Sequence, residues 1–68
     1  SQLLQILSAR DLAMLRQVAE GGTYKEVAEM FGLAEKTVRN AFSLMMARLS
    51  LDSRAQLIAA YVRATETQ

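Results

Sequence analysis

A strip of polar side chains along residues 35–49 is the part of this sequence best suited to contact a partner. On an α-helix, at about 100° per residue, the strip lies opposite the apolar side of the same segment. Its polar members are Lys36, Arg39, Asn40 and Ser43, and the small Ala47 lies on the same side of the helix. Lysine and arginine can bind guanine or a phosphate, and asparagine can pair with adenine through two hydrogen bonds. The strip is therefore a candidate DNA-reading surface, although an ordinary solvated helix face can carry the same residue types.

Helices are the elements that must position this strip. The sequence has no proline, and its β-branched residues never alternate with polar ones over a strand's length, so we expect an all-α fold. Three helix starts have the spacing of a capping box, in which two side chains satisfy free backbone N–H groups: Ser8 with Asp11, Thr23 with Glu26, and Ser53 with Gln56. The predicted helices cover residues 9–20, 24–31, 35–49 and 53–64.

Apolar residues at helical spacing predict the core. The first helix should face inward with Leu12, Leu15, and Val18 or Ala19. The third should do so with Val38, Phe42, Met45, Met46 and Leu49. The start of this third helix is weak because Ala34 replaces the usual Ser or Thr cap, a difference of typically about 1 kcal/mol.

The length of 68 residues allows one domain, which we expect over residues 7–64. Residues 1–6 are expected to be a linker or helix end from an upstream domain, or a disordered end left by cloning with Leu7 alone docked. Residues 65–68 are expected to fray.

Composition excludes several classes of function. The chain has no cysteine and no histidine, which removes disulfides, the common zinc sites and the usual general base. No segment approaches the roughly 18 consecutive apolar residues of a membrane span. We therefore expect no enzyme, no catalytic residue, no metal, no cofactor, no small-molecule ligand and no membrane contact, in a soluble cytoplasmic protein. The net charge of only +1 means that a nucleic-acid function must rest on where the charges lie.

The turn "FGLA" between the second and third predicted helices indicates a helix-turn-helix, because so short a connection makes the two helices cross at a wide angle. The second helix of such a pair enters the major groove, while the first lies across the backbone. The polar strip is on this second helix, and its candidate base contacts are Lys36, Arg39, Asn40 and Ser43.

The stretch "LSARDLAMLRQVAEGGTYKEVAEMFGLAEKTVRNAFSLMMARLSLDSR" resembles the DNA-binding domain of LuxR/NarL-type (GerE-like) transcription regulators. The match runs without gaps from about residue 7 to 62, and "LAEKTVRN" is particularly similar to DosR (DevR)-type response regulators. The resemblance implies a four-helix bundle of the C-terminal effector type, belonging to a two-component response regulator that binds promoter DNA as a homodimer.

The resemblance also assigns roles by position. Lys36, Arg39, Asn40 and Ser43 match positions for base contacts. The positions for phosphate contacts are Lys25, Thr37 and Arg54, and Tyr24 is either a fourth or a cover for its helix start. The last helix is implied to pair two domains, and its residues placed for this are Ala55, Ile58, Ala59 and Val62, although burial within the domain also explains them.

Three departures from the family pattern bear on affinity: Ala34, Ala41 and Leu44. Leu44 flanks the strip where a DosR-like member carries a basic residue, so one phosphate contact is expected to be missing. The rival interpretation is a degenerate helix-turn-helix, or a sigma-like module, that acts mainly through protein contacts. RNA polymerase is a further candidate partner in either case.

Overall fold

The computed structural model describes residues 2–66, and within them the secondary structure is entirely α-helical, which confirms the all-α prediction. The helices are α1 (Gln2–Ile6), α2 (Ala9–Ala19), α3 (Tyr24–Phe31), α4 (Glu35–Arg48) and α5 (Arg54–Glu66). The four helices predicted from the sequence correspond to α2–α5. No helix within residues 2–66 is both long and apolar enough to cross a membrane.

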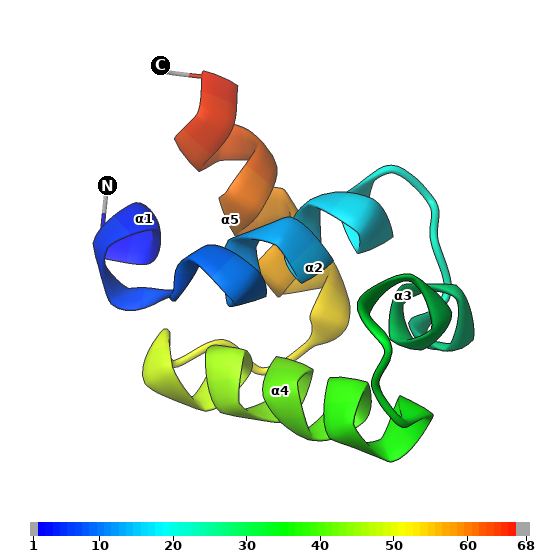
Figure 1. Ribbon diagram of the computed structural model, residues 1–68. Coiled ribbons are helices and arrows are strands. Elements are labelled where there is room, and N and C mark those ends of the chain that lie inside the picture. The colour runs from blue at the N-terminus through cyan, green and yellow to red at the C-terminus, as the bar shows by residue number, and fades with distance from the viewer. Residues whose placement is uncertain (1, 67–68) are drawn as a thin grey trace.

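Helix α1 was not among the four helices predicted for the domain. Residues 1–6 were expected to be a linker or helix end from an upstream domain, or a disordered end with Leu7 alone docked. Residues 2–6 are helical and Leu3 is buried with Leu7, which contradicts the disordered end. Leu3 and Leu7 are one helical turn apart, so both can enter the core from the same side. The segment packs against α5 (Figure 1). Ser1 and residues 67–68 lie outside the described part of the chain, so the expected fraying of residues 67–68 stays a prediction.

The other end also differs from expectation, because α5 continues past Ala64 to Glu66. Thr65 was expected in the frayed tail. Its hydroxyl donates to the carbonyl oxygens of Tyr61 and Val62, at 3.0 and 3.1 Å, which attaches this residue to the preceding turn.

Helix starts follow the predicted spacing, with differences in detail. Thr23 and Glu26 form both bonds of a capping box. The Ser8 hydroxyl accepts from the backbone N–H of Asp11 at 3.1 Å, but among the described residues no hydrogen bond from the backbone N–H of Ser8 to the Asp11 carboxylate is present. Ser53 accepts from the N–H of Gln56, whose side-chain oxygen accepts from Asp52 instead of from Ser53 (2.7 Å). Each start is therefore fixed by a side-chain acceptor, and only one is a complete box.

The core lies where α2, α3, α4 and α5 meet. Its fully buried side chains are Phe42, Met14, Leu15, Met45, Leu57, Val27 and Val38. Met14 is fully buried but was not among the residues predicted to face inward from α2. Leu12 and Met46 are partly buried against this core.

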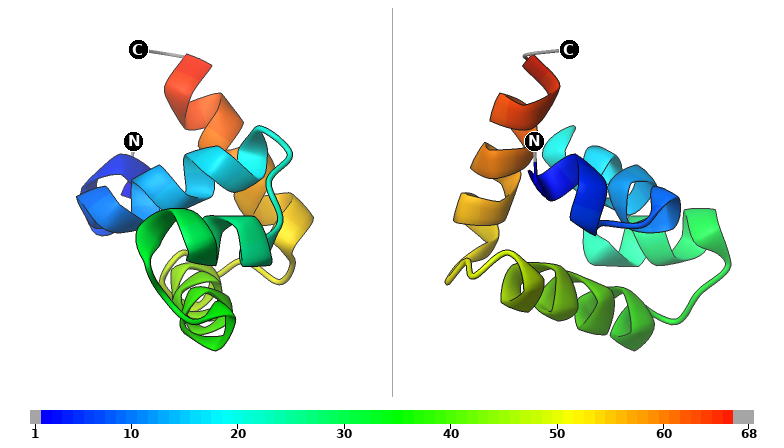
Figure 2. Two further views of the ribbon diagram at one scale, coloured as in Figure 1. Left: turned by 45° about the vertical axis from the view of Figure 1, so that its right-hand side comes forward. Right: turned by 90° about the vertical axis from the view of Figure 1, so that its left-hand side faces the viewer.

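Helices α3 and α4 form the predicted helix-turn-helix. In the left view of Figure 2, α4 is seen almost end-on while α3 runs across it, so the two helices cross at a wide angle. The turn requires Gly32, whose φ of 67° is in the left-handed region that favours glycine. Helix α4 lies along one edge of the molecule (Figure 1), which leaves one side of it open to a partner.

Candidate nucleic-acid interface

The polar strip of α4 faces away from the core. Lys36, Arg39, Asn40 and Ser43 are all exposed. Val38, Phe42 and Met45, on the opposite side of the helix, have no exposed surface. The structure thus brings the four predicted base-contact side chains onto one open face, and their contact with bases stays a prediction.

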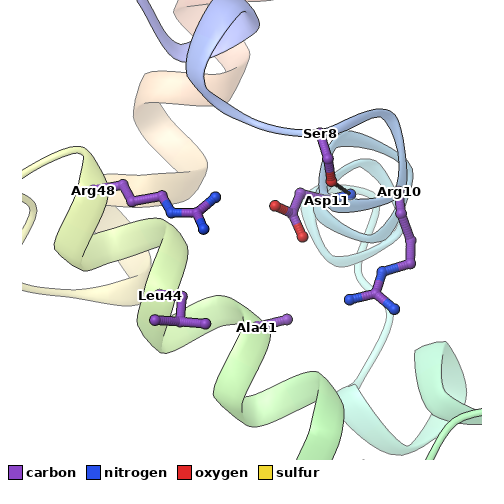
Figure 3. Close-up of a pocket in the computed structure, with 6 residues that line it drawn as sticks. All are labelled: Ser8, Arg10, Asp11, Ala41, Leu44 and Arg48. Atoms are coloured by element: carbon purple, nitrogen blue, oxygen red, sulfur yellow. Dashed lines mark hydrogen bonds between the residues drawn. The ribbon is translucent and has the colours of Figure 1, made fainter.

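A hollow of about 270 Å³ lies beside this strip, between the start of α2 and the second half of α4 (Figure 3). Its lining consists of Ser8, Arg10, Asp11, Ala41, Leu44 and Arg48. At about 100° per residue, Leu44 is only about 40° around α4 from Asn40, so the hollow begins where the strip ends. Leu44, which stands where a DosR-like member is expected to carry a basic residue, is 56% exposed.

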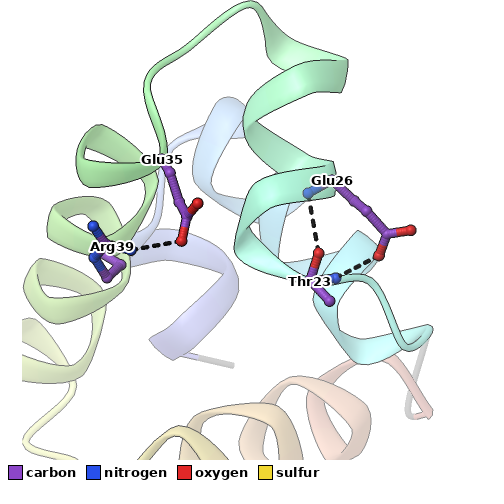
Figure 4. A network of polar contacts seen from close by, with 4 residues as sticks. All are labelled: Thr23, Glu26, Glu35 and Arg39. Atoms are coloured by element: carbon purple, nitrogen blue, oxygen red, sulfur yellow. Dashed lines mark hydrogen bonds and ion pairs between the residues drawn. The ribbon is translucent and has the colours of Figure 1, made fainter.

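Arg39 is paired within its own helix. Its Nη1 donates to Oε2 of Glu35 at 2.6 Å (Figure 4). Sequence analysis overlooked this pair, although an acid four residues before an arginine is the spacing at which side chains meet on a helix. The central candidate for base recognition is therefore held along the helix surface in the free domain.

The start of α4 lacks a side-chain cap, as predicted from Ala34. The backbone N–H of Thr37 donates to the carbonyl of Ala34 at 3.0 Å, and Ala34 has the extended backbone of an N-cap residue. Thr37, a predicted phosphate contact, is exposed in this first turn.

Two other predicted phosphate contacts meet in a stack that sequence analysis did not find. The guanidinium of Arg54 lies over the ring of Tyr24, 4.7 Å from its centroid. The Tyr24 ring in turn packs against Phe42, with 4.8 Å between centroids. Three helices contribute one residue each, so no local spacing could have indicated the contact. The stack fixes the starts of α3 and α5 beside the middle of α4.

Lys25 follows Tyr24 in the first turn of α3 and is exposed. The position of this turn is set by the capping box between Thr23 and Glu26 (Figure 4), with distances of 2.9 and 3.1 Å. The backbone N–H of Thr23 and, to a lesser extent, the Thr23 side chain form hydrogen bonds with the Glu26 carboxylate. Both bonds favour the charged carboxylate, so they lower the pKa of Glu26 from its ordinary value of 4.5.

The residues predicted to pair two domains lie on one side of α5. Ala55 and Val62 are exposed, and Ile58 and Ala59 are partly buried. Leu57 and Ala64, which are buried, are on the opposite side of the helix. Ile58 also packs against the core, so it serves the domain itself as well as any interface.

Within residues 2–66 there is no group of three or more acidic, histidine or cysteine side chains that could hold a metal ion. The charged side chains discussed above are instead arranged around α4.

Comparisons with known proteins give a consistent result. The sequence model of the LuxR family of bacterial regulatory proteins (GerE) matches residues 5–61. A Pseudomonas aeruginosa protein named "Putative transcriptional regulator" is 38% identical over 58 residues, which are 85% of this chain and 28% of that protein. The DNA-binding transcriptional activator DevR/DosR of Mycobacterium tuberculosis is 40% identical over 60 residues, 88% of this chain and 26% of that protein. The chain thus spans little more than a quarter of each relative. No solved structure matches it significantly.

Proposed function

Because the chain belongs to the LuxR family of bacterial regulatory proteins, whose helix-turn-helix domains bind DNA, we propose that it reads promoter DNA as a dimer. It would do so as the C-terminal effector domain of a response regulator. Membership confirms the family resemblance seen in the sequence. The similarity of "LAEKTVRN" to DosR-type regulators and the 40% identity to DevR/DosR support the response-regulator assignment.

The observation that carries the proposal is the open face of α4. Lys36, Arg39 and Asn40 are exposed together along a helix that lies at the edge of the molecule, and Ser43 is small enough to let that helix sit deep in a groove. Lysine and arginine recognise guanine, and asparagine recognises adenine, by hydrogen bonds in the major groove. In this proposal α4 occupies the groove and these side chains select the sequence.

Phosphate contacts would set the position of α4 in the groove. Lys25 and Thr37 are exposed in the first turns of α3 and α4. Arg54 is held by Tyr24, so its charge is already oriented before DNA arrives. Such contacts fix register and orientation without reading sequence.

Dimerisation would use the outer side of α5. Ala55 and Ala59 are small, which allows two helices to approach closely, and Val62 adds exposed apolar surface. A two-fold DNA site would then place one α4 in each half-site. The protein would act in the cytoplasm, with RNA polymerase as a further partner and without catalytic activity.

A second candidate function is a module that acts mainly through protein contacts. Exposed apolar side chains favour it, above all Met30 and Leu44, which are 63% and 56% exposed. The four polar residues of the strip favour DNA, and the two functions differ in whether the folded domain binds a duplex at all.

The deciding experiment is fluorescence anisotropy with a two-fold DNA site of the family type and a scrambled duplex, over a series of salt concentrations. We expect preference for the two-fold site and a steep loss of affinity with salt. Arg39→Ala should cost about 1–3 kcal/mol on the two-fold site and relax the preference, whereas Lys25→Ala should weaken both duplexes equally. A folded wild-type domain that binds neither duplex would favour the protein-contact function.

A further inference from the structure

The hollow between α2 and α4 holds two arginines to which neither the sequence nor the family resemblance assigned a role. Arg48 extends from the last turn of α4 toward α2, and Arg10 extends from α2 toward α4 (Figure 3). Among the described residues neither guanidinium forms an ion pair, whereas Arg16 and Arg39 both do. Two unpaired cations that border one hollow fit an anionic partner.

The place of the hollow on α4 suggests which anion it meets. On one flank of the polar strip, Phe42 carries the Tyr24 ring and the guanidinium of Arg54. On the other flank, Leu44 and Arg48 face the hollow. A helix in the major groove has one sugar-phosphate backbone along each of its sides. The two flanks of α4 therefore carry positive charge where a groove-bound helix meets the two DNA strands.

Thr37 supports the same placement. It lies two helical turns before Leu44 on the same side of α4, at about 100° per residue. It is also a predicted phosphate contact. This flank of α4 thus has one predicted phosphate contact near the start of the helix, and the hollow lies on the same flank near its end.

We propose that Arg10 and Arg48 bind a backbone phosphate of the DNA strand opposite to the one that Arg54 approaches. The inference rests on the proposed DNA-binding function and adds a second anchored strand to it. It also changes what is expected of Leu44: the basic group missing at that position is replaced by two guanidiniums from its neighbours. Leu44 and Ala41 then form an uncharged floor that leaves space for the phosphate.

Asp11 opposes this binding in part. Its carboxylate also lines the hollow, and two guanidiniums with one carboxylate leave a net charge of +1. The hollow should therefore attract phosphate only moderately. Removing the charge of Asp11 should raise the affinity for DNA, whereas removing the charges of the two arginines should lower it.

The test compares DNA affinity over a salt series for the whole 68-residue chain and its variants. The double variant Arg10→Gln/Arg48→Gln should weaken binding to the two-fold and scrambled duplexes by the same factor. Its slope of log affinity against log salt should be shallower by about 0.9 for each phosphate that the variant no longer neutralises. Arg10→Lys/Arg48→Lys should keep the slope, and Asp11→Asn should strengthen binding to both duplexes.

The matched control is Arg63→Gln, which removes an exposed arginine from the end of α5, remote from α4 (Figure 1). Far-UV circular dichroism checks that each variant is folded. A double glutamine variant that behaves like Arg63→Gln, while the wild type binds DNA normally, overturns the inference and leaves the proposed function intact. A wild type that binds no DNA overturns both.

Inorganic phosphate tests whether the anion is free or part of DNA. We expect no saturable shift of the Arg10 and Arg48 side-chain resonances when phosphate replaces chloride at constant ionic strength. Saturable shifts, together with unchanged DNA affinity in the double glutamine variant, would assign the hollow to a free anion and overturn the DNA contact.

Discussion

In the free domain Arg39 donates a hydrogen bond to Glu35, its neighbour one turn earlier, with 2.6 Å between Nη1 and Oε2. Both side chains are about half exposed, at 54% and 45%. Exposed ion pairs between residues four apart on a helix contribute only about 0.3–0.5 kcal/mol to stability. A bidentate contact between arginine and guanine is worth about 1–3 kcal/mol of discrimination. The pair is therefore weak enough to be exchanged for a base contact.

Glu35→Gln should raise the affinity for the two-fold and scrambled duplexes alike, because it removes a negative charge from the surface that meets DNA phosphates. Preference for the two-fold site should be unchanged, since Arg39 is retained. Anisotropy at one low salt concentration measures both quantities. The control is Glu20→Gln, which breaks the corresponding pair with Arg16 in α2 and should change DNA affinity less. Loss of preference in the Glu35 variant would show instead that the carboxylate orients Arg39 for its base.

Tyr24→Ala should lower both stability and DNA affinity, because the ring supports Arg54 and packs on Phe42. Tyr24 is only partly buried, so we expect the free energy of unfolding to fall by about 1–3 kcal/mol, less than the 3–5 kcal/mol typical of a buried aromatic side chain. Urea unfolding and a salt series measure the two effects. Tyr24→Phe keeps the stack and should retain most of both. An equal loss of DNA affinity in a stable Tyr24→Phe variant would assign the role to the hydroxyl group.

The capping box of α3 should make folding stability dependent on pH. The pKa of Glu26 is lowered from 4.5 in the folded state by the N–H of Thr23. The charged carboxylate therefore stabilises the fold above its ordinary pKa, and this contribution is lost as the pH falls through the lowered value. Thermal melts of the wild type and Glu26→Gln should converge in that acidic range and separate near pH 6. A separation that does not change with pH would contradict this assignment.

Most of the fold could be predicted because its determinants are local. Thr23 and Gly32 mark the ends of α3, and the spacing of apolar residues marks the inner face of α4. Helix α1 was absent from the predicted helices because its five residues, Gln2–Ile6, are too few for apolar residues to recur at helical spacing. It is stabilised by burial of Leu3 in the core beside α5, which is a tertiary effect.

The site was predicted less completely for the same reason. Positions on one helix, such as Lys36 and Asn40, follow from its periodicity. The stack of Arg54 on Tyr24 and the hollow between Arg10 and Arg48 join different helices, so their geometry requires the packed structure. The pair of Glu35 with Arg39 is the exception, since its spacing was readable and was overlooked.

Val62→Glu should reduce cooperative binding to the two-fold site if the outer side of α5 joins two domains. Val62 is 39% exposed, so the change places a charge in the proposed interface without disturbing the core. Ile58→Glu should do the same but also lower stability, because Ile58 packs on the core. The measured quantity is the ratio of affinities for a two-fold site and a single half-site. Met30→Glu, on α3, is the control and should leave this ratio unchanged. An unchanged ratio in both α5 variants would exclude this dimer surface.

Ala34→Ser should stabilise the domain by about 1 kcal/mol, the usual contribution of an N-cap side chain. Ala34 has φ −73° and ψ 148°, close to the −87° and 162° of Thr23, which does cap its helix, so a serine should fit without a change of backbone. Its hydroxyl would accept from the N–H of Thr37. For a domain of this size the melting temperature should rise by about 4–8 °C.

The control for this substitution is Thr23→Ala, which removes an existing cap and should lower the melting temperature by a similar amount. If Thr23→Ala destabilises and Ala34→Ser has no effect, the start of α4 does not have N-cap geometry in solution. A rise in melting temperature would mean instead that α4, the helix expected to enter the groove, starts from a backbone already set for a cap and lacks only the acceptor.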